Sequence, residues 1–188
     1  VRDRLYLNVG PDWKGRSQFR EAASEAGIEA AAVDHGLGSA FTDVNGDVLA
    51  GKQLATTEEV WYKSVDGYRI QGWIVKPADF DPAKKYPLLV LINGGPQGAW
   101  NDGWSYRWNP QVFAAAGFVV FAPNPRGSVG WGQQFEDDIN RDWGGRAYED
   151  VMRGTDFAEA LPYVAKGRTV AAGASYGGYL VNWIAGHT

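Results

Sequence analysis

Ser175 lies in the segment Gly173-Ala174-Ser175-Tyr176-Gly177, which has the pattern Gly-x-Ser-x-Gly. In a nucleophile elbow of this pattern the serine occupies a tight strand-to-helix turn, and the glycines allow neighbouring backbone to pass close by. The pattern alone is weak evidence for an elbow in a chain with 25 glycines, so the flanking segments must show whether a strand precedes it and a helix follows it. An apolar run precedes it at 169–172 and an apolar, helix-like run follows at 179–185. We therefore predict that Ser175 is a nucleophile in acyl transfer; an ordinary Gly-rich turn is the alternative.

A second segment supplies what such a nucleophile needs. Asn93-Gly94-Gly95-Pro96 directly follows the apolar run Leu88–Ile92. Acyl transfer requires N–H donors for the oxyanion of the tetrahedral intermediate. One donor comes from the residue after the nucleophile and another from a loop after an earlier strand. We expect the backbone N–H groups of Tyr176 and Gly95 to form this oxyanion hole, with a plain strand-to-loop turn as the alternative for the second segment.

The sequence offers few candidates for the general base, since its only two histidines are His35 and His187. A serine nucleophile needs a base within hydrogen-bond reach. His187 lies twelve residues after Ser175, and twelve residues of helix span about 18 Å. His35 lies far upstream, in the segment 1–56, whose residue pattern differs from that of the rest of the chain. Neither histidine is predicted to be the base.

Composition excludes several other classes of protein. The 188 residues are 45% hydrophobic and carry a formal net charge of −4, with no basic excess that would indicate nucleic-acid binding. No apolar run approaches the roughly 18 residues of a membrane helix. Without cysteine the sequence offers no thiolate metal ligands, with two histidines it offers no His-rich site, and we predict no metal. Five of nine tryptophans fall between positions 100 and 143, which indicates a core or a cleft wall.

Hydrophobic patterning from residue 57 onward predicts an α/β fold with a largely parallel sheet. Alternating segments at 60–65 and 68–75 flank Asp66-Gly67 and predict a hairpin. Continuous apolar runs at 88–92, 118–122 and 169–172 predict buried strands. A helix is expected to begin at Asn109-Pro110 and end at Gly117, and an amphipathic helix is expected over 146–160. Residues 123–145 are expected to form a loop.

Residues 1–56 differ from the rest and are predicted to form a separate strand- and turn-rich segment. Arg4 to Val9 alternates between polar and apolar residues, and Phe41 to Leu49 contains Asn45-Gly46, a type I′ hairpin signal. We therefore divide the chain into 1–56 and 57–188. The chain starts at Val1 and stops thirteen residues after Ser175, so we interpret it as a piece of a longer protein.

Several further motifs stand in a fixed order along residues 58–187: Gly72-Trp73, Lys84-Lys85-Tyr86-Pro87, Gly94-Gly95-Pro96-Gln97-Gly98-Ala99-Trp100, Arg107-Trp108-Asn109-Pro110-Gln111-Val112-Phe113, Asn124-Pro125-Arg126-Gly127-Ser128, Asp142-Trp143-Gly144-Gly145 and Gly173-Ala174-Ser175-Tyr176-Gly177-Gly178-Tyr179. Together they resemble the catalytic domain of the prolyl oligopeptidase family of serine peptidases. The details are most similar to the dipeptidyl-peptidase V branch, and next to acylaminoacyl peptidases.

This resemblance implies an α/β-hydrolase fold, here truncated after the helix that follows the elbow, with a β-propeller cap of which residues 1–56 would be a remnant. It implies a Ser, Asp, His triad in that chain order, with Ser175 as nucleophile and with Asp and His beyond the end of this chain. It also implies an oxyanion hole from Gly95 and Tyr176. One departure is Asn93, where the family usually has His before Gly-Gly-Pro; we expect the loop to persist.

The function implied by the resemblance is hydrolysis of peptide bonds near the amino terminus of peptides, through an acyl-enzyme and without a cofactor. The partners would be peptide substrates, with no nucleic acid and no membrane, and the location periplasmic or secreted. Two alternatives stay open: an esterase of the same fold, and a catalytically inert module. The fragment alone is expected to be inactive, since it lacks the triad Asp and His.

Overall fold

The computed structural model describes residues 6–11, 17–21 and 50–188. Contacts divide the chain into two units, Val1–Gly51 and Lys52–Thr188, each described here by itself. In the first unit, β1 (Tyr6–Pro11) pairs antiparallel with β2 (Ser17–Glu21), so the alternating segment at 4–9 does contribute to a strand. The expected hairpin at 41–49 lies outside the described residues. The interpretation of residues 1–56 as a propeller remnant stays a prediction.

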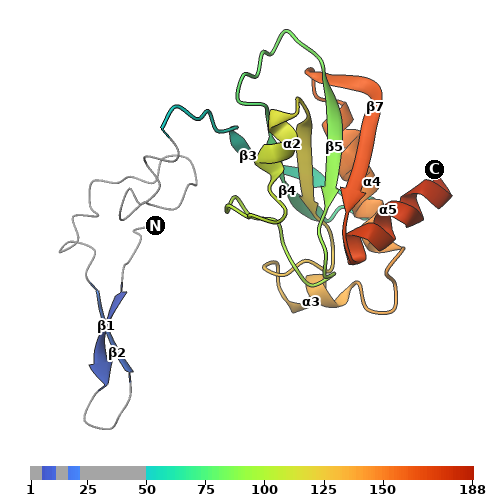
Figure 1. Cartoon of the computed structure of the whole chain (residues 1–188). Helices are drawn as coiled ribbons and strands as arrows, with labels where there is room; N and C mark the ends of the chain where they lie inside the picture. Colours follow the sequence, from blue (N-terminus) through green and yellow to red (C-terminus); the bar gives the residue numbers. More distant parts are fainter. Residues whose placement is uncertain (1–5, 12–16, 22–49) are drawn as a thin grey trace. The chain divides into compact units, whose positions relative to one another are not determined.

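The second unit is built on a five-stranded sheet with the order β3-β4-β6-β5-β7 (Figure 1). Its strands are β3 (Thr57–Lys63), β4 (Arg69–Val75), β5 (Tyr86–Ile92), β6 (Val119–Asn124) and β7 (Val164–Gly173). The hairpin β3–β4 is antiparallel and joins β6 antiparallel, whereas β6, β5 and β7 are parallel neighbours. The predicted hairpin and the predicted parallel part are therefore both present in one mixed sheet.

Helices cover both faces of this sheet (Figure 1). The larger core contains Leu88, Val90 and Ile92 of β5 and lies under α4 (Arg146–Glu159) and α5 (Tyr176–His187). The alternate side chains Leu89 and Leu91 belong to a smaller core under α2 (Pro110–Ala115). Because successive side chains of a strand point to opposite faces, the continuous apolar run of β5 serves both cores.

Local chemistry sets the ends of α2 as predicted. The side chain of Asn109 caps the helix by accepting a hydrogen bond from the backbone N–H of Gln111, and Pro110 occupies the first turn. The helix ends before Gly117, whose φ of 90° favours glycine. Helix α4 also agrees with the predicted range, with Ala147, Val151 and Ala158 buried on one face.

Two expectations were wrong in detail. The region 123–145 is not entirely loop, because it contains the short helix α3 (Gln133–Asp137), which buries Phe135. Strand β7 begins five residues earlier than the predicted run at 169–172 and is not buried on both faces; Val170 is 49% exposed. Its place at the edge of the described sheet explains this exposure, since the strand has a single neighbour, β5.

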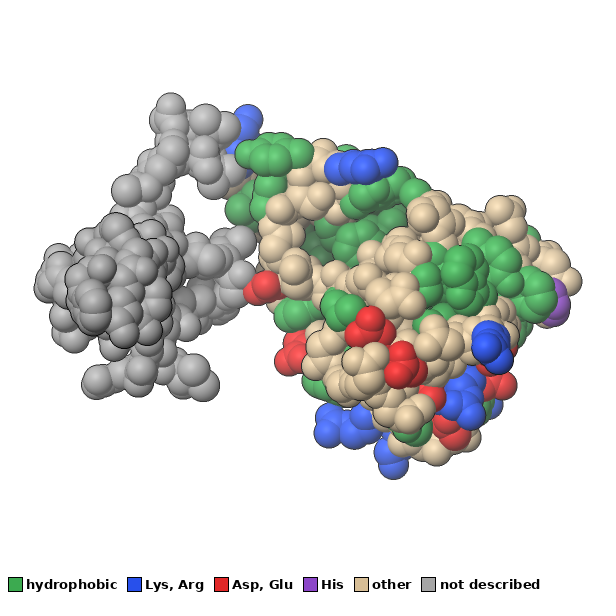
Figure 2. All heavy atoms as spheres, turned by 90° about the horizontal axis from the view of Figure 1, so that it is seen from below, with side chains coloured by type: hydrophobic (Ala, Val, Ile, Leu, Met, Phe, Trp, Pro, Cys, Tyr) green, Lys and Arg blue, Asp and Glu red, His purple; other side chains and the backbone are tan. Residues whose placement is uncertain are grey.

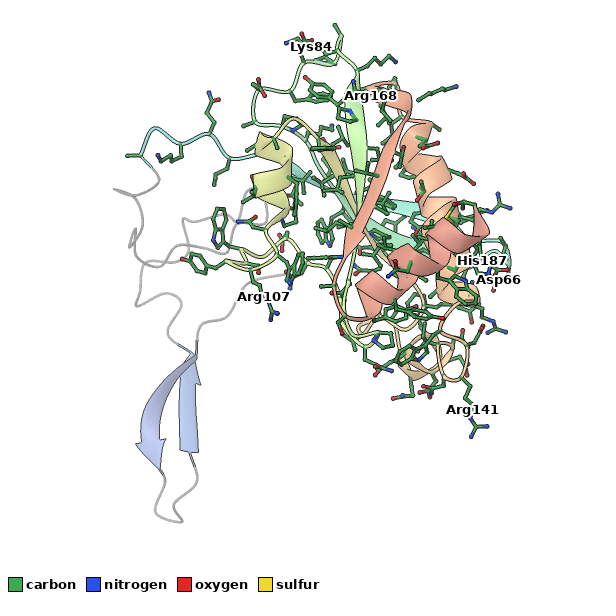
Figure 3. The ribbon with its side chains drawn as sticks, turned by 45° about the vertical axis from the view of Figure 1, so that its right-hand side comes forward. Asp66, Lys84, Arg107, Arg141, Arg168 and His187 are labelled. Atoms are coloured by element: carbon green, nitrogen blue, oxygen red, sulfur yellow. The ribbon has the colours of Figure 1, made fainter. Side chains whose placement is uncertain are left out.

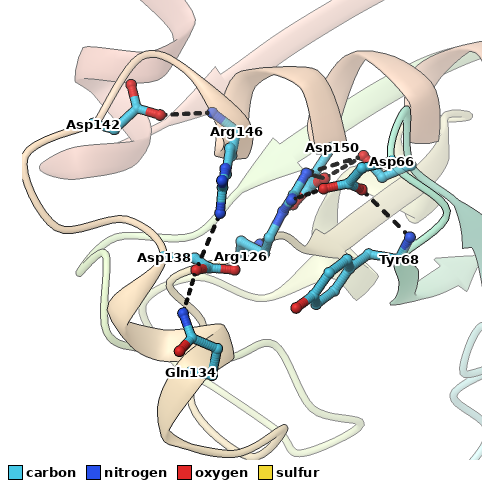
Figure 4. Close-up of polar contacts among 9 residues, drawn as sticks. Asp66, Tyr68, Arg126, Gln134, Asp138, Asp142, Arg146 and Asp150 are labelled. Atoms are coloured by element: carbon cyan, nitrogen blue, oxygen red, sulfur yellow. Dashed lines mark hydrogen bonds and ion pairs between the residues drawn. The ribbon is translucent and has the colours of Figure 1, made fainter.

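A buried ion pair ties the sheet to α4. Arg126, which follows β6 and is 1% exposed, donates hydrogen bonds to both carboxylate oxygens of the fully buried Asp150 (Figure 4). It also contacts Asp66 in the β3–β4 turn. Partial desolvation opposes ionisation of Asp66, but the hydrogen bond and charge of Arg126 outweigh it and hold the pKa of that carboxyl below its usual value. One guanidinium therefore joins the hairpin, the loop after β6 and α4.

We predict that Asp150→Asn lowers the free energy of unfolding by about 3 kcal/mol, because a buried charge loses its buried partner. Asp66→Asn, which removes the 40%-exposed partner of the same guanidinium, should cost less than about 1 kcal/mol. Since the folded-state pKa of Asp66 is lowered, its small contribution is present above the ordinary carboxyl pKa and is lost as the pH falls below it. Urea denaturation of both variants at neutral and acidic pH measures this; equal losses at neutral pH would contradict the account.

Candidate active site

Ser175 occupies a strained strand-to-helix turn between the end of β7 at Gly173 and the start of α5 at Tyr176. Its backbone has φ 56° and ψ −124°, a sparsely populated region for a residue with a side chain. Such conformations cost about 1–3 kcal/mol and persist when the surrounding structure imposes them. The predicted sequence of strand, serine and helix is therefore present, with the serine at its sharpest point.

The two glycines of the pattern make this turn possible. A Cβ on Gly173 would lie 2.6 Å from the carbonyl carbon of Gly177. A Cβ on Gly177 would lie 2.3 Å from the carbonyl oxygen of Ile92, the last residue of β5. Both distances are far below van der Waals contact, so a side chain at either position would force the backbone apart. The turn is thereby packed directly against the end of the neighbouring strand.

We predict that Gly177→Ala lowers the free energy of unfolding by about 3 kcal/mol, through the overlap of its Cβ with the Ile92 carbonyl. Gly178→Ala is the matched control, since a Cβ there would approach Gly173 no closer than 3.4 Å. It should leave stability unchanged within about 0.5 kcal/mol or raise it slightly, because alanine favours a helix over glycine. Urea denaturation of both variants tests this. Equal stability of the two would show that the turn is not tightly packed.

The loop that follows β5 lies against the elbow. A Cβ on Gly94 would be 3.2 Å from the carbonyl oxygen of Ala174 and 3.6 Å from the Cβ of Ser175. Gly95 is exposed and has φ 142°, and a Cβ there would lie 2.6 Å from the backbone nitrogen of Gln97. Only glycine fits this backbone. The structure therefore brings together the two segments that the sequence analysis paired, with Gly94 in contact with the elbow and Gly95 next along the loop.

Tyr176, the first residue of α5, is buried beside the elbow. Its hydroxyl donates a hydrogen bond to the backbone carbonyl of Trp143, 2.9 Å away, and its ring packs between Trp143 and Tyr179. Burial raises the pKa of Tyr176, so its hydroxyl stays a neutral donor. Contacts with Trp143, which lies outside α5, thus hold the side chain of Tyr176 in place. They also fix the position of the Tyr176 backbone, which directly follows Ser175.

A pocket of about 400 Å³ opens beside Ser175. Three tryptophans of the segment between β5 and α2, Trp100, Trp104 and Trp108, line it together with Asn93. Viewed from the side to which β5 and β7 run, hydrophobic side chains gather around a hollow in this unit (Figure 2). The tryptophan cluster seen in the sequence is therefore divided: these three line the pocket, whereas Trp131 packs against the core. The spacing of the tryptophans in the sequence does not distinguish those that line the pocket from those that pack in the core.

His187 does not approach Ser175. It lies at the far end of the twelve-residue helix α5 (Figure 3), a distance of about 18 Å along the axis. Its ring stacks on Trp183 with centroids 4.1 Å apart, and its Nδ1 contacts the Trp183 carbonyl. His35 lies outside the described residues. Within residues 50–188, the structure accordingly places Ser175 at a helix N-terminus but brings no histidine to it.

The described residues offer two further observations. Among them, no cluster of three or more His, Cys, Asp or Glu is arranged to hold a metal ion. None of their helices has the length and apolar character needed to cross a membrane.

Comparisons with known proteins agree with this geometry. Residues 104–188 match the model of the prolyl oligopeptidase family. The dipeptidyl-peptidase 5 of Schizosaccharomyces pombe is 56% identical over 138 residues, and that of Trichophyton equinum is 53% identical over 133 residues. These matches cover 73% and 69% of this chain but 20% and 18% of the relatives. The chain thus spans about a fifth of the length of these curated relatives.

Among solved structures, the acylaminoacyl peptidase of Pyrococcus horikoshii superposes with a TM-score of 0.69 and 29% identity, over 76% of this chain and 23% of that one. The mixed sheet, the flanking helices and the serine turn define residues 52–188 as part of an α/β-hydrolase fold. Its motifs, the match of residues 104–188 and its curated relatives are those of the prolyl oligopeptidase family. The resemblance inferred from the sequence is therefore confirmed.

Proposed function

We propose that the protein carrying this chain is a serine peptidase that hydrolyses peptide bonds near the amino terminus of its substrates, in the manner of dipeptidyl-peptidases and acylaminoacyl peptidases. The observation that carries the proposal is the strained turn that places Ser175 between β7 and α5, against the Gly94-Gly95 loop. The names of the relatives support a peptide substrate.

In the proposed reaction the Oγ of Ser175 attacks the carbonyl carbon of the scissile peptide bond and its proton passes to a general base. The negative charge that develops on the carbonyl oxygen is stabilised by the backbone N–H groups of Gly95 and Tyr176, near the positive end of the α5 dipole. The carbon–nitrogen bond then breaks as the base protonates the leaving amine, and water hydrolyses the acyl-enzyme. No metal or cofactor takes part.

The base and its orienting carboxylate are proposed to come from parts of the protein other than residues 50–188. His187 supports this, because stacking on Trp183 and its position at the end of α5 keep it from the nucleophile. The match covers 20% of the Schizosaccharomyces pombe relative, which leaves room for these residues elsewhere in a protein of that length.

The first experiment compares Ser175→Ala with the wild type in the full-length protein that carries this chain. Turnover of dipeptidyl and N-acyl-aminoacyl chromogenic amides should fall by about four orders of magnitude or more, because the covalent route is lost. Thr155→Ala, which removes a hydroxyl bonded within α4 to the Val151 carbonyl, is the control and should keep its activity. A Ser175→Ala variant with a tenth of wild-type turnover would show that Ser175 is not the nucleophile. Turnover of esters alone would favour the esterase alternative.

A second prediction concerns the 188-residue chain itself. We expect its turnover of the same amides to lie at least about three orders of magnitude below that of the full-length protein, because the described residues bring no base to Ser175. Assays of both proteins at equal molar concentration measure this difference. Comparable rates would mean that a base within the chain reaches the serine.

A further inference from the structure

Asn93 and Gly94 form an Asn-Gly pair at the point where β5 ends and the loop beside Ser175 begins. In any Asn-X pair the backbone nitrogen of the second residue can attack the side-chain carbonyl carbon of the asparagine, because this closes a five-membered ring. Glycine hinders the attack least, since it has no Cβ and its backbone reaches conformations that other residues avoid. The covalent requirements for spontaneous deamidation are therefore met at Asn93.

Within the described part of the chain, hydrogen bonds do not hold the two reacting groups in place. The Nδ2 of Asn93 is buried there and has no hydrogen-bond partner. The N–H of Gly94, which must lose its proton, donates to no backbone carbonyl among the same residues. A buried polar group in a native protein normally has at least one partner. No such bond at Nδ2 has to break before the Gly94 nitrogen reaches the Asn93 side chain.

The surroundings of the pair leave room for the reaction and supply water. The Asn93 amide lies over Gly98, where a Cβ would be 2.6 Å from its Nδ2. Asn93 and Gly94 both line the pocket of about 400 Å³ that opens beside Ser175. Water in this pocket can accept the proton of the Gly94 nitrogen and can later hydrolyse the ring.

Other asparagines of the chain lack one or more of these features. Asn109 and Asn124 precede proline, whose nitrogen carries no proton to lose. The side chain of Asn140 precedes an arginine and donates a hydrogen bond to Asp137 at 3.2 Å. Asn45 also precedes a glycine but lies outside the described residues, so it serves as a reference for the Asn-Gly sequence alone.

We propose that Asn93 is a site of spontaneous deamidation that limits the working lifetime of the candidate active site. The Gly94 nitrogen loses its proton and bonds to the Cγ of Asn93, the bond between Cγ and Nδ2 breaks, and ammonia leaves. Water then opens either carbonyl of the resulting succinimide, which gives aspartate or isoaspartate at position 93. The reaction consumes one water and needs no oxidant or reductant.

Both products oppose the proposed acyl transfer, and this part of the inference rests on the proposed function. A carboxylate at position 93 places a negative charge two residues from the Gly95 N–H, where the oxyanion is proposed to develop. Isoaspartate also lengthens the main chain before Gly94 by one carbon. Gly94 has little room to move, because a Cβ there would already lie 3.2 Å from the Ala174 carbonyl oxygen and 3.6 Å from the Cβ of Ser175.

The test ages the full-length protein at mildly alkaline pH and physiological temperature and withdraws samples for peptide mapping by mass spectrometry. The peptide that contains Asn93 should gain the mass that replacement of NH₂ by OH adds, and part of it should accept a methyl group from protein isoaspartyl methyltransferase. The gain should be faster at higher pH, because base removes the proton from the Gly94 nitrogen. Turnover of peptide amides should fall with the same rate constant as the amide at Asn93.

Three variants separate this reaction from general loss of activity. Asn93→Gln would have to close a six-membered ring, so it should gain no mass at position 93 and keep whatever activity it has when fresh. Asn140→Gln is the matched control and should age as the wild type does. Asn93→Asp carries one product from the start, and its kcat should be about tenfold below that of the fresh wild type while KM stays within about twofold.

The outcomes distinguish this inference from the proposed function. Retention of the amide at Asn93 while Asn45 deamidates would overturn the inference and leave the proposed function standing, because packing of the loop would then protect the pair. A mass gain at Asn93 with unchanged turnover would overturn the lifetime limit. A fresh wild type that hydrolyses no amide would overturn the proposed function and the lifetime limit with it, whereas the peptide map would still decide whether Asn93 is the modified residue.

Discussion

The approach of Gly177 to the carbonyl oxygen of Ile92 is the contact on which the candidate site depends. It brings the first turn of α5 against the end of β5, where a Cβ would lie 2.3 Å from that oxygen. With the two elements this close, Ser175 is forced into its strained backbone conformation, and the loop from Asn93 to Gly95 follows directly beside it. The parallel pairing of β5 with β7 sets the register that makes the contact possible, since Ile92 and Gly173 are partners in it. The site is therefore a consequence of two parallel strands ending together.

Around this contact, polar side chains buried in the sheet hold the irregular segments that a parallel sheet leaves at its ends. Asn124 holds the segment at Trp100, and two residues later Arg126 links the loop after β6 to Asp150 of α4. Asn124 is the last residue of the central strand β6, and Arg126 lies just beyond its end. Buried polar groups of this kind are costly unless they are fully paired. Their pairing here gives loops without secondary structure a defined position relative to Ser175.

Much of this architecture could be predicted from the sequence because the deciding interactions are local. The Asn109 cap with Pro110 marks the start of α2, and Gly117 marks its end. The pattern around Ser175 identifies the elbow because its glycines are required by backbone contacts within a few residues and with one neighbouring strand. The pairing of Gly94-Gly95 with Ser175 could be predicted from chemistry, since acyl transfer requires N–H donors from the residue after the nucleophile and from a loop after an earlier strand.

What the sequence could not predict depends on tertiary contacts. The half exposure of Val170 follows from the position of β7 in the strand order, which an apolar run does not reveal. The division of the tryptophans between pocket and core likewise has no pattern in the sequence. The hydrogen bond between Asn124 and Trp100 joins residues 24 positions apart, and no sequence motif marks it. The helix α3 forms in a Gly-rich region because Phe135 packs into the core beside Trp131.

The central claim is that the elbow presents Ser175 as an activated nucleophile. The most direct measurement is peptide mapping by mass spectrometry after the full-length protein has reacted with a fluorophosphonate, which bonds covalently to activated serines. The account predicts a single adduct, on the peptide that contains Ser175, at close to one equivalent per protein and prevented by prior denaturation. An adduct on another residue, or no adduct on a folded and peptide-hydrolysing protein, would contradict it.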